Sequence, residues 1–519
     1  MSLSTNSLAA AVGASVKNVQ FQPTAEVLPR KILIIGTYDN TLSPVENTPI
    51  QILSPEDAAT RFGFGFMIHR MAKRVFEGSN GIECWAIAQP DGAGASQAVG
   101  SLTVTITGNV VGVYRLYIGA ELVAVNVTST MTSNDLATAV AAAINADNDL
   151  PVTAAVNGVT LNQVDVTAKD NARWGNYIDM SDNIGAGEEL PSGLAVTYTQ
   201  LSGGLGTGTI QNALNALGTG DDANQDHFTD VVHGYGIETS VIDAISLYVG
   251  LGNDFLGLYD KLVSRPFRAI TGDTQAGSAG LAALQVITDA RLTDRANGII
   301  AVPGSRTHSS EIAAAAVGNM ARISNERPEQ SYVGIQLANV DPGDQSDRWT
   351  SDYDSRDAAV KSGISPTRVQ NGAVYLQNVV SFYRPTTVAV TSNGYRSMRN
   401  ISILQNILKN IRTTFEQEKW LGISIVQDVA KVSSTVNRQK ARDIDAVKDD
   451  LTALARAFES KAWIYTAEFT IEKLKEAGAV TIRSGNVGFD AIFSIILSGE
   501  GVILDTVAEF DTSIAVLSS

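Results

Sequence analysis

Cysteine and histidine are scarce in this sequence, which has one cysteine and four histidines among 519 residues. A single cysteine forms no intrachain disulfide, and these side chains do not have the spacing of a zinc site. Cys84 lies in a mostly apolar run, residues 82–87, which predicts a buried strand cysteine rather than a nucleophile. We therefore expect no metal site and no cofactor.

The sequence also lacks any run of about 18 apolar residues, so no membrane-spanning helix is predicted. Its first residues, MSLSTNSLAAAVGAS, have neither the basic nor the apolar segment of a secretory signal. Basic residues number 38 against 54 acidic ones, a net charge of −16, which argues against nucleic acid or an anionic membrane as the main partner. We expect a protein that is made in a cytoplasm and inserts into no membrane.

Motifs that would indicate an enzyme are missing or incomplete. The segment 202–208 lies where a phosphate loop would lie, but it lacks the Gly-Lys-Ser/Thr ending, and a flexible hinge is predicted instead. His308 directly precedes Ser309 and Ser310, and adjacent side chains rarely face one another. One of these serines is expected to cap a helix that begins at Glu311. No catalytic residue is predicted.

A polar loop rich in aspartate is a candidate metal site. Asp341, Asp344 and Asp347 precede the segment 348–357, with a spacing that could hold Ca²⁺. The loop lacks the Gly and Glu positions of an EF-hand. Calcium binding stays open, and a salt-bridged interface loop is the favoured interpretation.

Charge is distributed unevenly along the chain. Residues 100–208 contain 3 basic and 10 acidic residues, whereas residues 396–461 contain 12 basic and 8 acidic ones. The plain interpretation is that the acidic residues of the first segment serve solubility and that the basic excess of the second is a chance variation in charge. The sharper one is that the two segments face different surroundings in an assembly.

An α/β pattern follows a short N-terminal segment. Residues 1–25 are rich in Ser, Ala and Asn and predict an arm. Residues 31–37 form an apolar run typical of a central strand buried on both faces. Ser54 then precedes Pro55 and two acids, which predicts an N-capped helix. A helix near 66–76 and a strand at 83–88 complete a β-α-α-β start.

A different pattern interrupts this domain between residues 94 and 206. Segments rich in Thr and Val alternate with period two, which is typical of antiparallel strands. Strands are predicted at residues 102–106, 113–118, 122–127, 152–156, 159–161, 164–167 and 194–198. Ser133 is expected to cap one amphipathic helix. Glycine-rich segments at 91–96 and 202–208 predict hinges that bound an inserted domain.

The α/β pattern then resumes and gives way to a different C-terminal part. Helices are predicted at residues 209–217, 240–249, 309–325, 400–418 and 441–458. Strands are predicted at residues 228–232, 267–271, 298–302, 332–336, 374–383, 463–469, 480–482, 489–497 and 503–510.

The predicted fold class is therefore α/β and α+β, with several domains. A mostly parallel α/β core domain, residues 26–93 and 207–365, is interrupted by a β-rich inserted domain, residues 94–206. A C-terminal α+β domain, residues 366–502, follows. Extended arms are predicted at both ends, residues 1–25 and 503–519.

The order of these segments resembles the tail sheath proteins of contractile phages, and most closely the Mu-like branch. The segment Ser54 to Gly63, SPEDAATRFG, looks like a helix found in sheaths, and Cys84 to Ile87 looks like the strand after it. The inserted segments Leu150 to Ala154 and Gly175 to Asp179 are typical of that branch. The resemblance covers nearly the whole chain. It lies in the order of segments, since sheaths have no catalytic signature.

The resemblance implies a structural subunit that is not an enzyme. Sheath subunits stack as six-membered rings around a tail tube, exchange terminal arms as strands in neighbouring sheets, and contract to drive the tube through the target envelope. The implied partners are further copies of the chain, the tail tube protein, and baseplate and tail terminator proteins. The implied location is the virion, after assembly in a host bacterial cytoplasm.

The residues fit this mechanism physically, because a spare strand binds by adding to the sheet edge of another chain. The candidate arm residues are Val16, Val19, Phe21, Val507, Phe510, Ile514 and Val516. The C-terminal domain is expected to contact the tube through a basic face. The candidate tube-facing residues are Arg396, Arg399, Lys409, Arg412, Arg438, Lys440 and Arg442.

Two alternatives stay open. The first is the sheath of a phage-derived bacteriocin or of a secretion-type contractile particle, related to R-type pyocin and type VI secretion sheaths. The second is an enzyme with a Rossmann-like core, such as a hydrolase. The sequence does not distinguish a phage from a bacteriocin.

Overall fold

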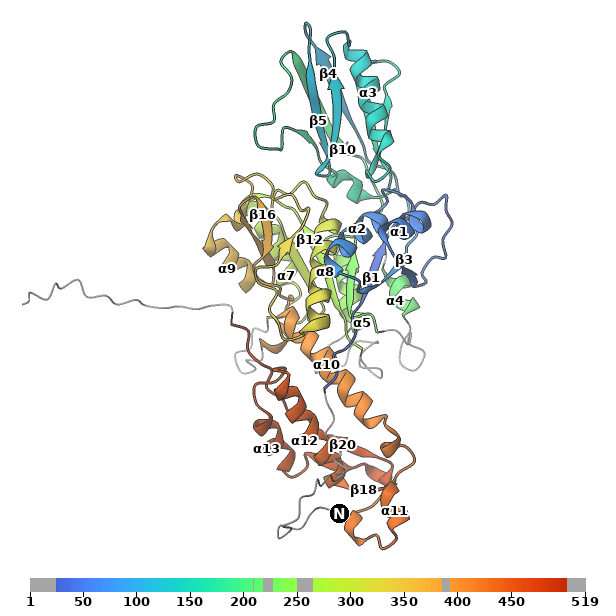
Figure 1. Ribbon diagram of the computed structural model, residues 1–519, viewed down its shortest axis with the longest axis vertical. Coiled ribbons are helices and arrows are strands. Elements are labelled where there is room, and N and C mark those ends of the chain that lie inside the picture. Colours follow the sequence, from blue (N-terminus) through green and yellow to red (C-terminus); the bar gives the residue numbers. More distant parts are fainter. Residues whose placement is uncertain (1–24, 209, 218–226, 250–264, 385–392, 502–519) are drawn as a thin grey trace, which may run out of the picture. The chain divides into compact units, whose positions relative to one another are not determined.

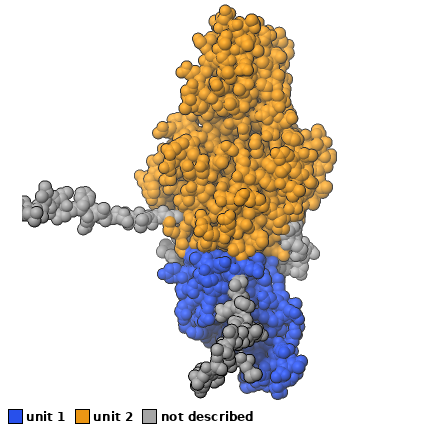
Figure 2. Space-filling view, viewed as in Figure 1, with its two compact units in different colours: residues 1–26, 409–498 blue, residues 27–408, 499–519 orange. Residues whose placement is uncertain are grey.

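The structure is a computed structural model that describes residues 25–208, 210–217, 227–249, 265–384 and 393–501. The predicted arm residues Val16, Val19, Phe21, Val507, Phe510, Ile514 and Val516 and the predicted strand 503–510 lie outside these ranges. The chain divides into two compact units, coloured separately in Figure 2. The smaller unit comprises Met1–Glu26 and Lys409–Ser498, and the larger comprises Val27–Leu408 and Gly499–Ser519.

A nine-stranded sheet forms the centre of the larger unit, in the order β14-β16-β15-β13-β12-β11-β1-β3-β2. Its strands are β1 (Lys31–Gly36), β2 (Ile50–Ile52), β3 (Glu83–Ala88), β11 (Asp230–His233), β12 (Arg268–Asp273), β13 (Asn297–Ala301), β14 (Gln336–Leu337), β15 (Ser365–Gln370) and β16 (Ala373–Leu376). The run from β3 to β15 is parallel, and β2, β16 and β14 add antiparallel edges. The predicted mostly parallel sheet is confirmed.

Strand β1 lies in the apolar run of residues 31–37, which predicted a central strand buried on both faces. Ile32 to Ile35 are fully buried, because β1 has a parallel neighbour on each side. Helices then cover the sheet, as parallel strands require crossover connections. The helices of this α/β part are α1 (Pro55–Phe62), α2 (Met67–Ser79), α4 (Gln211–Ala216), α5 (Thr239–Val249), α7 (Gly277–Asp289), α8 (Ser309–Glu326) and α9 (Tyr353–Lys361), with the 3₁₀ turns η3 (Trp349–Ser351) and η4 (Asn393–Tyr395).

Helices α2 and α8 pack against each other beside β1 (Figure 1). Gly318 on α8 permits this approach, since a Cβ there would lie 2.6 Å from the Val75 carbonyl oxygen. The Ser54 cap of α1 is confirmed, with its hydroxyl accepting the Asp57 N–H. The predicted serine cap of α8 is wrong. His308 is the N-cap, and its ring accepts the Ser310 N–H.

Residues 98–201 build a hydrophobic core of their own within the larger unit. One sheet has the order β10-β4-β8-β7 and another the order β6-β5-β9. Their elements are β4 (Val99–Ile106), β5 (Gly112–Ile118), β6 (Glu121–Val127), α3 (Ser133–Ala146), β7 (Val152–Val156), β8 (Gln163–Ala168), η1 (Arg173–Tyr177), β9 (Met180–Asp182) and β10 (Leu194–Ser202). Two local predictions here are wrong. Thr132, in a capping box with Asp135, caps α3, and residues 159–161 form a turn.

The glycine-rich segments that bound residues 94–206 were predicted as hinges. In the structure, parts of both segments are closely packed. Ser96 and Leu205 exchange backbone hydrogen bonds of 3.2 Å each. A Cβ at Gly208 would lie 2.3 Å from the Tyr235 ring, and one at Gly92 would lie 2.4 Å from the Thr207 carbonyl oxygen. Close approach of backbone to its neighbours explains Gly92 and Gly208, whereas Gly94 and Gly203 have open space around them and a positive φ that favours glycine.

The smaller unit contains short strands and helices around one apolar groove. Helix α10 (Met398–Phe415) begins in the larger unit and ends in the smaller one. The other elements are η5 (Glu418–Trp420), β17 (Ser424–Ile425), η6 (Val429–Lys431), α11 (Thr435–Lys440), β18 (Ala441–Arg442), α12 (Ile444–Ser460), α13 (Ala467–Lys475), β19 (Val480–Ile482), η7 (Ser484–Asn486) and β20 (Phe489–Ala491).

Several sequence predictions for the last third are corrected. The segment 463–469 is not a strand, because Thr466 caps helix α13 and the buried positions Ala467, Thr470 and Leu474 have helical spacing. Strand β14, Gln336–Leu337, overlaps the predicted strand 332–336 only at Gln336, and β20 ends at Ala491. A C-terminal domain was predicted to begin at residue 366. Strands β15 and β16 instead join the nine-stranded sheet, and the compact units divide at residues 408 and 409.

Candidate functional sites

The residues that could support catalysis have structural roles where the structure describes them. Cys84 is buried in β3, and burial raises the pKa of its thiol. His308 is buried, and its Nε2 lies 3.2 Å from the Trp174 carbonyl oxygen while Nδ1 lies 2.7 Å from Ser310 Oγ. Burial lowers the pKa of His308 to about 4, so the ring stays neutral at pH 7. It acts as a helix cap.

The aspartate-rich loop is held by arginine. Arg306 contacts Asp344 at 2.8 Å and Asp341 at 3.4 Å, and its backbone N–H donates to Asp341 Oδ2. Asp352 caps α9 by accepting the Ser355 N–H. In the described ranges, no group of three or more His, Cys, Asp or Glu side chains is arranged to hold a metal ion. The contacts fit the favoured interpretation of a salt-bridged loop.

A buried charge cluster joins residues 98–201 to the α/β sheet of the same unit. Arg70 and Arg74 project from α2, and both contact the Glu311 carboxylate of α8 at 3.1 Å. Arg70 also lies 3.7 Å from Asp170, and Arg74 lies 2.7 Å from Glu121. Asp170 and Glu121 belong to the inserted segment. The insertion is therefore fastened by ion pairs, and not only by its two chain connections.

The two buried carboxylates of this cluster differ electrostatically. Burial raises the pKa of Asp170, although Arg70 and the Thr37 hydroxyl, 2.6 Å away, act in the opposite direction. Burial alone would also raise the pKa of Glu311, but the guanidinium groups of Arg70 and Arg74 bring it below its usual range. Glu311 is the stabilising anion of the cluster, whereas ionised Asp170 is retained at an electrostatic cost.

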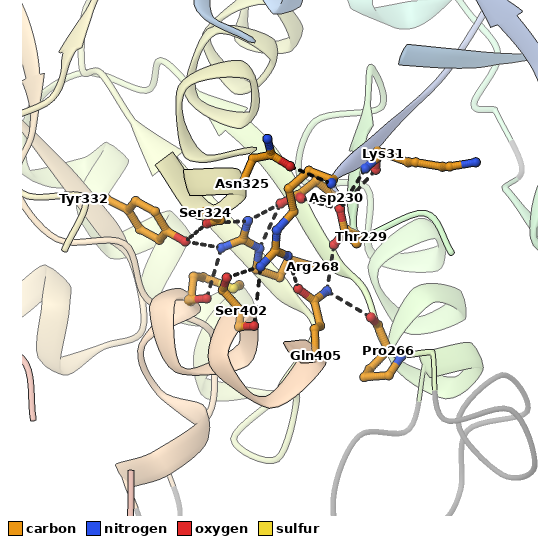
Figure 3. A network of polar contacts seen from close by, with 12 residues as sticks. Lys31, Thr229, Asp230, Pro266, Arg268, Ser324, Asn325, Tyr332, Ser402 and Gln405 are labelled. Carbon is orange, nitrogen blue, oxygen red and sulfur yellow. Dashed lines mark hydrogen bonds and ion pairs between the residues drawn. The ribbon is translucent and has the colours of Figure 1, made fainter. Parts of the chain in front are cut away.

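A second buried network lies at the amino-terminal ends of the parallel strands (Figure 3). Arg268 at the start of β12 forms an ion pair with Asp230 at the start of β11, and both side chains are fully or almost fully buried. Arg268 also donates to the Tyr332 hydroxyl, which lies 2.6 Å from Ser324 Oγ. A charge this deeply buried is tolerated because it is paired and hydrogen-bonded.

Helix α10 is fixed to the same edge of the sheet by polar side chains. Gln405 Nε2 donates to the carbonyl oxygens of Thr229 and Pro266 at 2.9 Å each (Figure 3). Its Oε1 accepts from the Arg30 guanidinium, which also donates to the Ser402 hydroxyl. The first half of α10 is thus bonded to the residue before β1, the residue before β11 and the segment before β12.

The segment that follows the predicted N-terminal arm is bonded to asparagines of α10. Within the smaller unit, Glu26 N donates to Asn410 Oδ1 at 2.9 Å and Asn410 Nδ2 donates back to Glu26 O at 2.8 Å. Within the larger unit, Leu28 N donates to Asn406 Oδ1. The asparagine side chains make the hydrogen bonds that a neighbouring strand would otherwise make with an extended backbone. The base of this arm is therefore held in both units.

The smaller unit carries an apolar groove of about 440 Å³. Its lining residues are Ile411, Phe415, Trp420, Val447, Leu451, Phe489, Ala491 and Phe493. Phe489 and Ala491 belong to β20, and among the described residues this strand pairs with β19 alone, in a two-stranded sheet. A two-stranded sheet is marginally stable alone. The groove and the strand edge together form a surface suited to a further extended segment.

Comparison with known proteins relates the chain to one curated relative. No protein-family model matches. The chain is 25% identical over 430 residues to the Mu-like prophage FluMu tail sheath protein of Haemophilus influenzae, covering 80% of this chain and 82% of that protein. The predicted resemblance to Mu-like tail sheath proteins is confirmed.

Solved structures of sheath proteins match the chain over most of its length with low scores. A sheath tail protein from Listeria innocua has a TM-score of 0.45 and 11% identity, covering 92% of this chain and 94% of that one. The helical sheath of the anti-feeding prophage in its contracted state has a TM-score of 0.41 and 10% identity, covering 98% and 100%. TM-scores below 0.5 do not establish an equivalent arrangement, so the relation to sheath proteins rests on the sequence match.

The structure separates the seven candidate tube-facing residues of this sheath-like chain into two groups. Arg396 and Arg399 belong to the larger unit. Arg399 is 3% exposed, and its Nε donates to the Glu329 carbonyl oxygen. Arg396 is half-buried and donates to the Val360 carbonyl oxygen at 2.6 Å. Neither side chain forms part of an open basic surface.

The remaining five candidates belong to the smaller unit. Lys409 and Arg412 are half-buried on α10, and Lys409 lies 3.6 Å from Glu26. Arg442 is half-buried, with its guanidinium 5.6 Å from the centre of the Trp420 ring. Arg438 and Lys440 on α11 are exposed.

The exposed pair is positioned by the backbone around it. Arg438 donates to the Val432 carbonyl oxygen, and Lys440 donates to those of Glu418 and Leu421. Of the candidates, these two present their charge most openly.

Sequence reasoning missed the polar residues that hold α10. Gln405, Asn406 and Asn410 were passed over because amides on a helix are usually on its solvent face. The available signal was their position among the apolar residues of the helix, next to Leu404, Ile407 and Ile411. Arg30 directly precedes the predicted strand 31–37 and Arg268 belongs to the predicted strand 267–271, and neither position indicates a buried ion pair or hydrogen bond.

Proposed function

We propose that this chain is a structural subunit of a contractile tail sheath. The observation that carries the proposal is the similarity to a tail sheath protein over four fifths of the chain. The subunit stacks as six-membered rings around a tail tube and contracts to drive the tube through the target cell envelope. It works in the virion, with the tail tube, baseplate and tail terminator proteins as partners, and needs no cofactor. The chain is not an enzyme.

Terminal arms link the subunits by strand exchange in this proposal. Head-to-tail contacts of this kind build open helical polymers rather than closed dimers. The paired Glu26 and Asn410 support it, because they hold the base of the N-terminal arm without using a strand partner from the same chain. Backbone hydrogen bonds between exchanged strands persist when the subunits rotate, which suits a lattice that contracts.

The apolar groove of the smaller unit receives the C-terminal arm of another copy. The support is the aromatic lining next to β20, whose other edge has no strand partner among the described residues, and the apolar residues of segment 503–519, with Phe510 as the aromatic anchor. Replacing Phe510 by Ser should prevent polymerisation and leave the unfolding of the monomer unchanged. Retained polymerisation would mean that another segment, such as the N-terminal arm, occupies the groove.

The tube is contacted through α11. Arg438 and Lys440 support this assignment because they are exposed cations on a short helix of the smaller unit. Lys409 and Arg412 remain secondary candidates, since they are half-buried. Binding of these cations to a tube of opposite charge would be an electrostatic contact at the rim of the interface, and added salt would weaken it.

The acidic insertion, residues 94–206, points away from the tube, where rings have room for it. Its net charge, from 3 basic and 10 acidic residues between 100 and 208, would be repelled by an acidic tube surface. Deleting residues 94–205 with a short linker should therefore leave polymerisation intact. Arg74 would lose the Glu121 carboxylate in this deletion but keep its ion pairs with Glu311 and Glu77.

Electron microscopy of the purified chain tests the proposal as a whole. Long hollow tubes with six-fold symmetry are the expected result. A monodisperse monomer that turns over a substrate would favour the alternative of an α/β enzyme.

A further inference from the structure

Glu500 lies where the chain returns from the smaller unit to the larger one before its final segment. Its carboxylate accepts a hydrogen bond from Ser397 Oγ at 2.9 Å and another from Ser331 Oγ. The glycines on either side, Gly499 and Gly501, are exposed, and a Cβ on either would meet no atom within 4 Å. The carboxylate is thus a fixed point between two residues that impose little on the backbone.

The two serines connect this carboxylate to the buried network of the sheet. Ser331 is followed by Tyr332, and Ser397 is followed by Met398. Arg268 donates to the Tyr332 hydroxyl and to the Met398 carbonyl oxygen, the latter at 3.1 Å. Glu500 is therefore connected to Arg268 of the sheet through two pairs of neighbouring residues. One pair is Ser331 and Tyr332, and the other is Ser397 and Met398.

The electrostatic surroundings also favour a carboxylate at this place. Ser397 immediately precedes helix α10, so the Glu500 carboxylate lies at the positive end of an 18-residue helix. Arg399, in the first turn of that helix, is a nearby cation. Hydrogen bonds to an ionised acceptor are stronger than those between neutral groups.

We propose that Glu500 is a clamp that fixes the base of the C-terminal arm to the α/β sheet, so that tension in the arm passes into the sheet through Ser331 and Ser397. The inference rests on the proposed function only in taking segment 503–519 as the exchanged arm. Glu500 is a positioning residue. It sets the point at which the arm leaves the subunit, and the flanking glycines let the arm take different directions from that point.

The clamp is tested in the monomer by the protease Glu-C, which cleaves after glutamate. The double variant Ser331→Ala with Ser397→Ala keeps Glu500 as a cleavage site but removes both donors. Cleavage after Glu500 should become on the order of 10- to 100-fold faster, because two hydrogen bonds to a charged group are lost. Cleavage after Glu476, an exposed glutamate of the smaller unit, is the internal reference and should not change.

Polymerisation supplies the second readout, with Glu500→Ala compared against Glu476→Ala. We expect Glu500→Ala tubes to dissociate at a lower denaturant concentration than wild-type or Glu476→Ala tubes, while the monomers unfold alike. An unchanged cleavage rate at Glu500 in the double serine variant would overturn the clamp. If the wild-type chain formed no tubes, the proposed function would fail, and the cleavage experiment would still decide on the clamp.

Discussion

His233, the last residue of β11, makes the stability of the larger unit depend on pH. The ring is 1% exposed, stacks on Tyr235 at a centroid distance of 6.0 Å, and its Nδ1 has no hydrogen-bond partner. Burial lowers its pKa from 6.5 to about 4. Between these values the unfolded chain binds a proton that the folded chain does not, so stability falls as pH falls from 6.5 towards 4.

The expected magnitude follows from the two pKa values. Between pH 7 and pH 5, His233 should lower the free energy of unfolding by about 2 kcal/mol. Replacing His233 by Phe keeps a buried ring of similar size and removes the titration. Urea unfolding at both pH values should show that the variant loses about 2 kcal/mol less than the wild type on acidification. Equal losses in the two proteins would refute the assignment of a neutral, buried His233.

Further substitutions test the buried networks and the basic surface. Glu311→Gln should lower the free energy of unfolding by roughly 3 kcal/mol at pH 7. This difference from wild type should shrink below about pH 4. The lowered pKa of Glu311 stabilises the fold at neutral pH, and that stabilisation is lost as pH falls through the pKa of the folded state. Arg268→Met should cost roughly 3–5 kcal/mol in urea unfolding, since Asp230 stays buried without its cation, and a loss below about 1 kcal/mol would contradict this. Arg438→Glu combined with Lys440→Glu should change monomer stability by less than about 0.5 kcal/mol but block assembly on tail tubes in a sedimentation assay, and normal assembly would exclude α11 from the tube contact.

The sequence predicted the elements whose patterns depend on burial alone. The strand at Lys31–Gly36 is apolar throughout because it has parallel neighbours on both sides, and that run is visible without a structure. Helix α10 was found because its apolar residues recur at helical spacing. The order of helices and strands then implied a parallel sheet, and the break in pattern after residue 93 indicated the insertion.

Elements set by distant contacts could not be predicted in the same way. The sequence predicts a strand over 463–469 because Trp463, Tyr465, Ala467 and Phe469 are apolar with period two. In the structure Tyr465 is 73% exposed and precedes helix α13. The segment 202–208 predicts a hinge from its glycines alone, because the packing of Gly208 against Tyr235 depends on the folded sheet.

The polar contacts that hold the candidate sites were hidden for a related reason. Arg268, Gln405 and Glu500 are ordinary surface residues by type. Their partners lie 38 to 375 positions away in the sequence. No local pattern of charge or hydropathy distinguishes a buried, paired polar residue from an exposed one, so these contacts required the fold.

Polymerisation of the purified chain is the most direct test of its role as a sheath subunit. Wild-type protein and a variant lacking residues 503–519 should be concentrated side by side and imaged by negative-stain electron microscopy. Wild-type protein should form long hollow tubes with six-fold symmetry, and the truncated variant should stay monomeric. Wild-type protein that remains a monomer under every assembly condition, or truncated protein that forms the same tubes, would contradict a sheath built by exchange of the C-terminal arm.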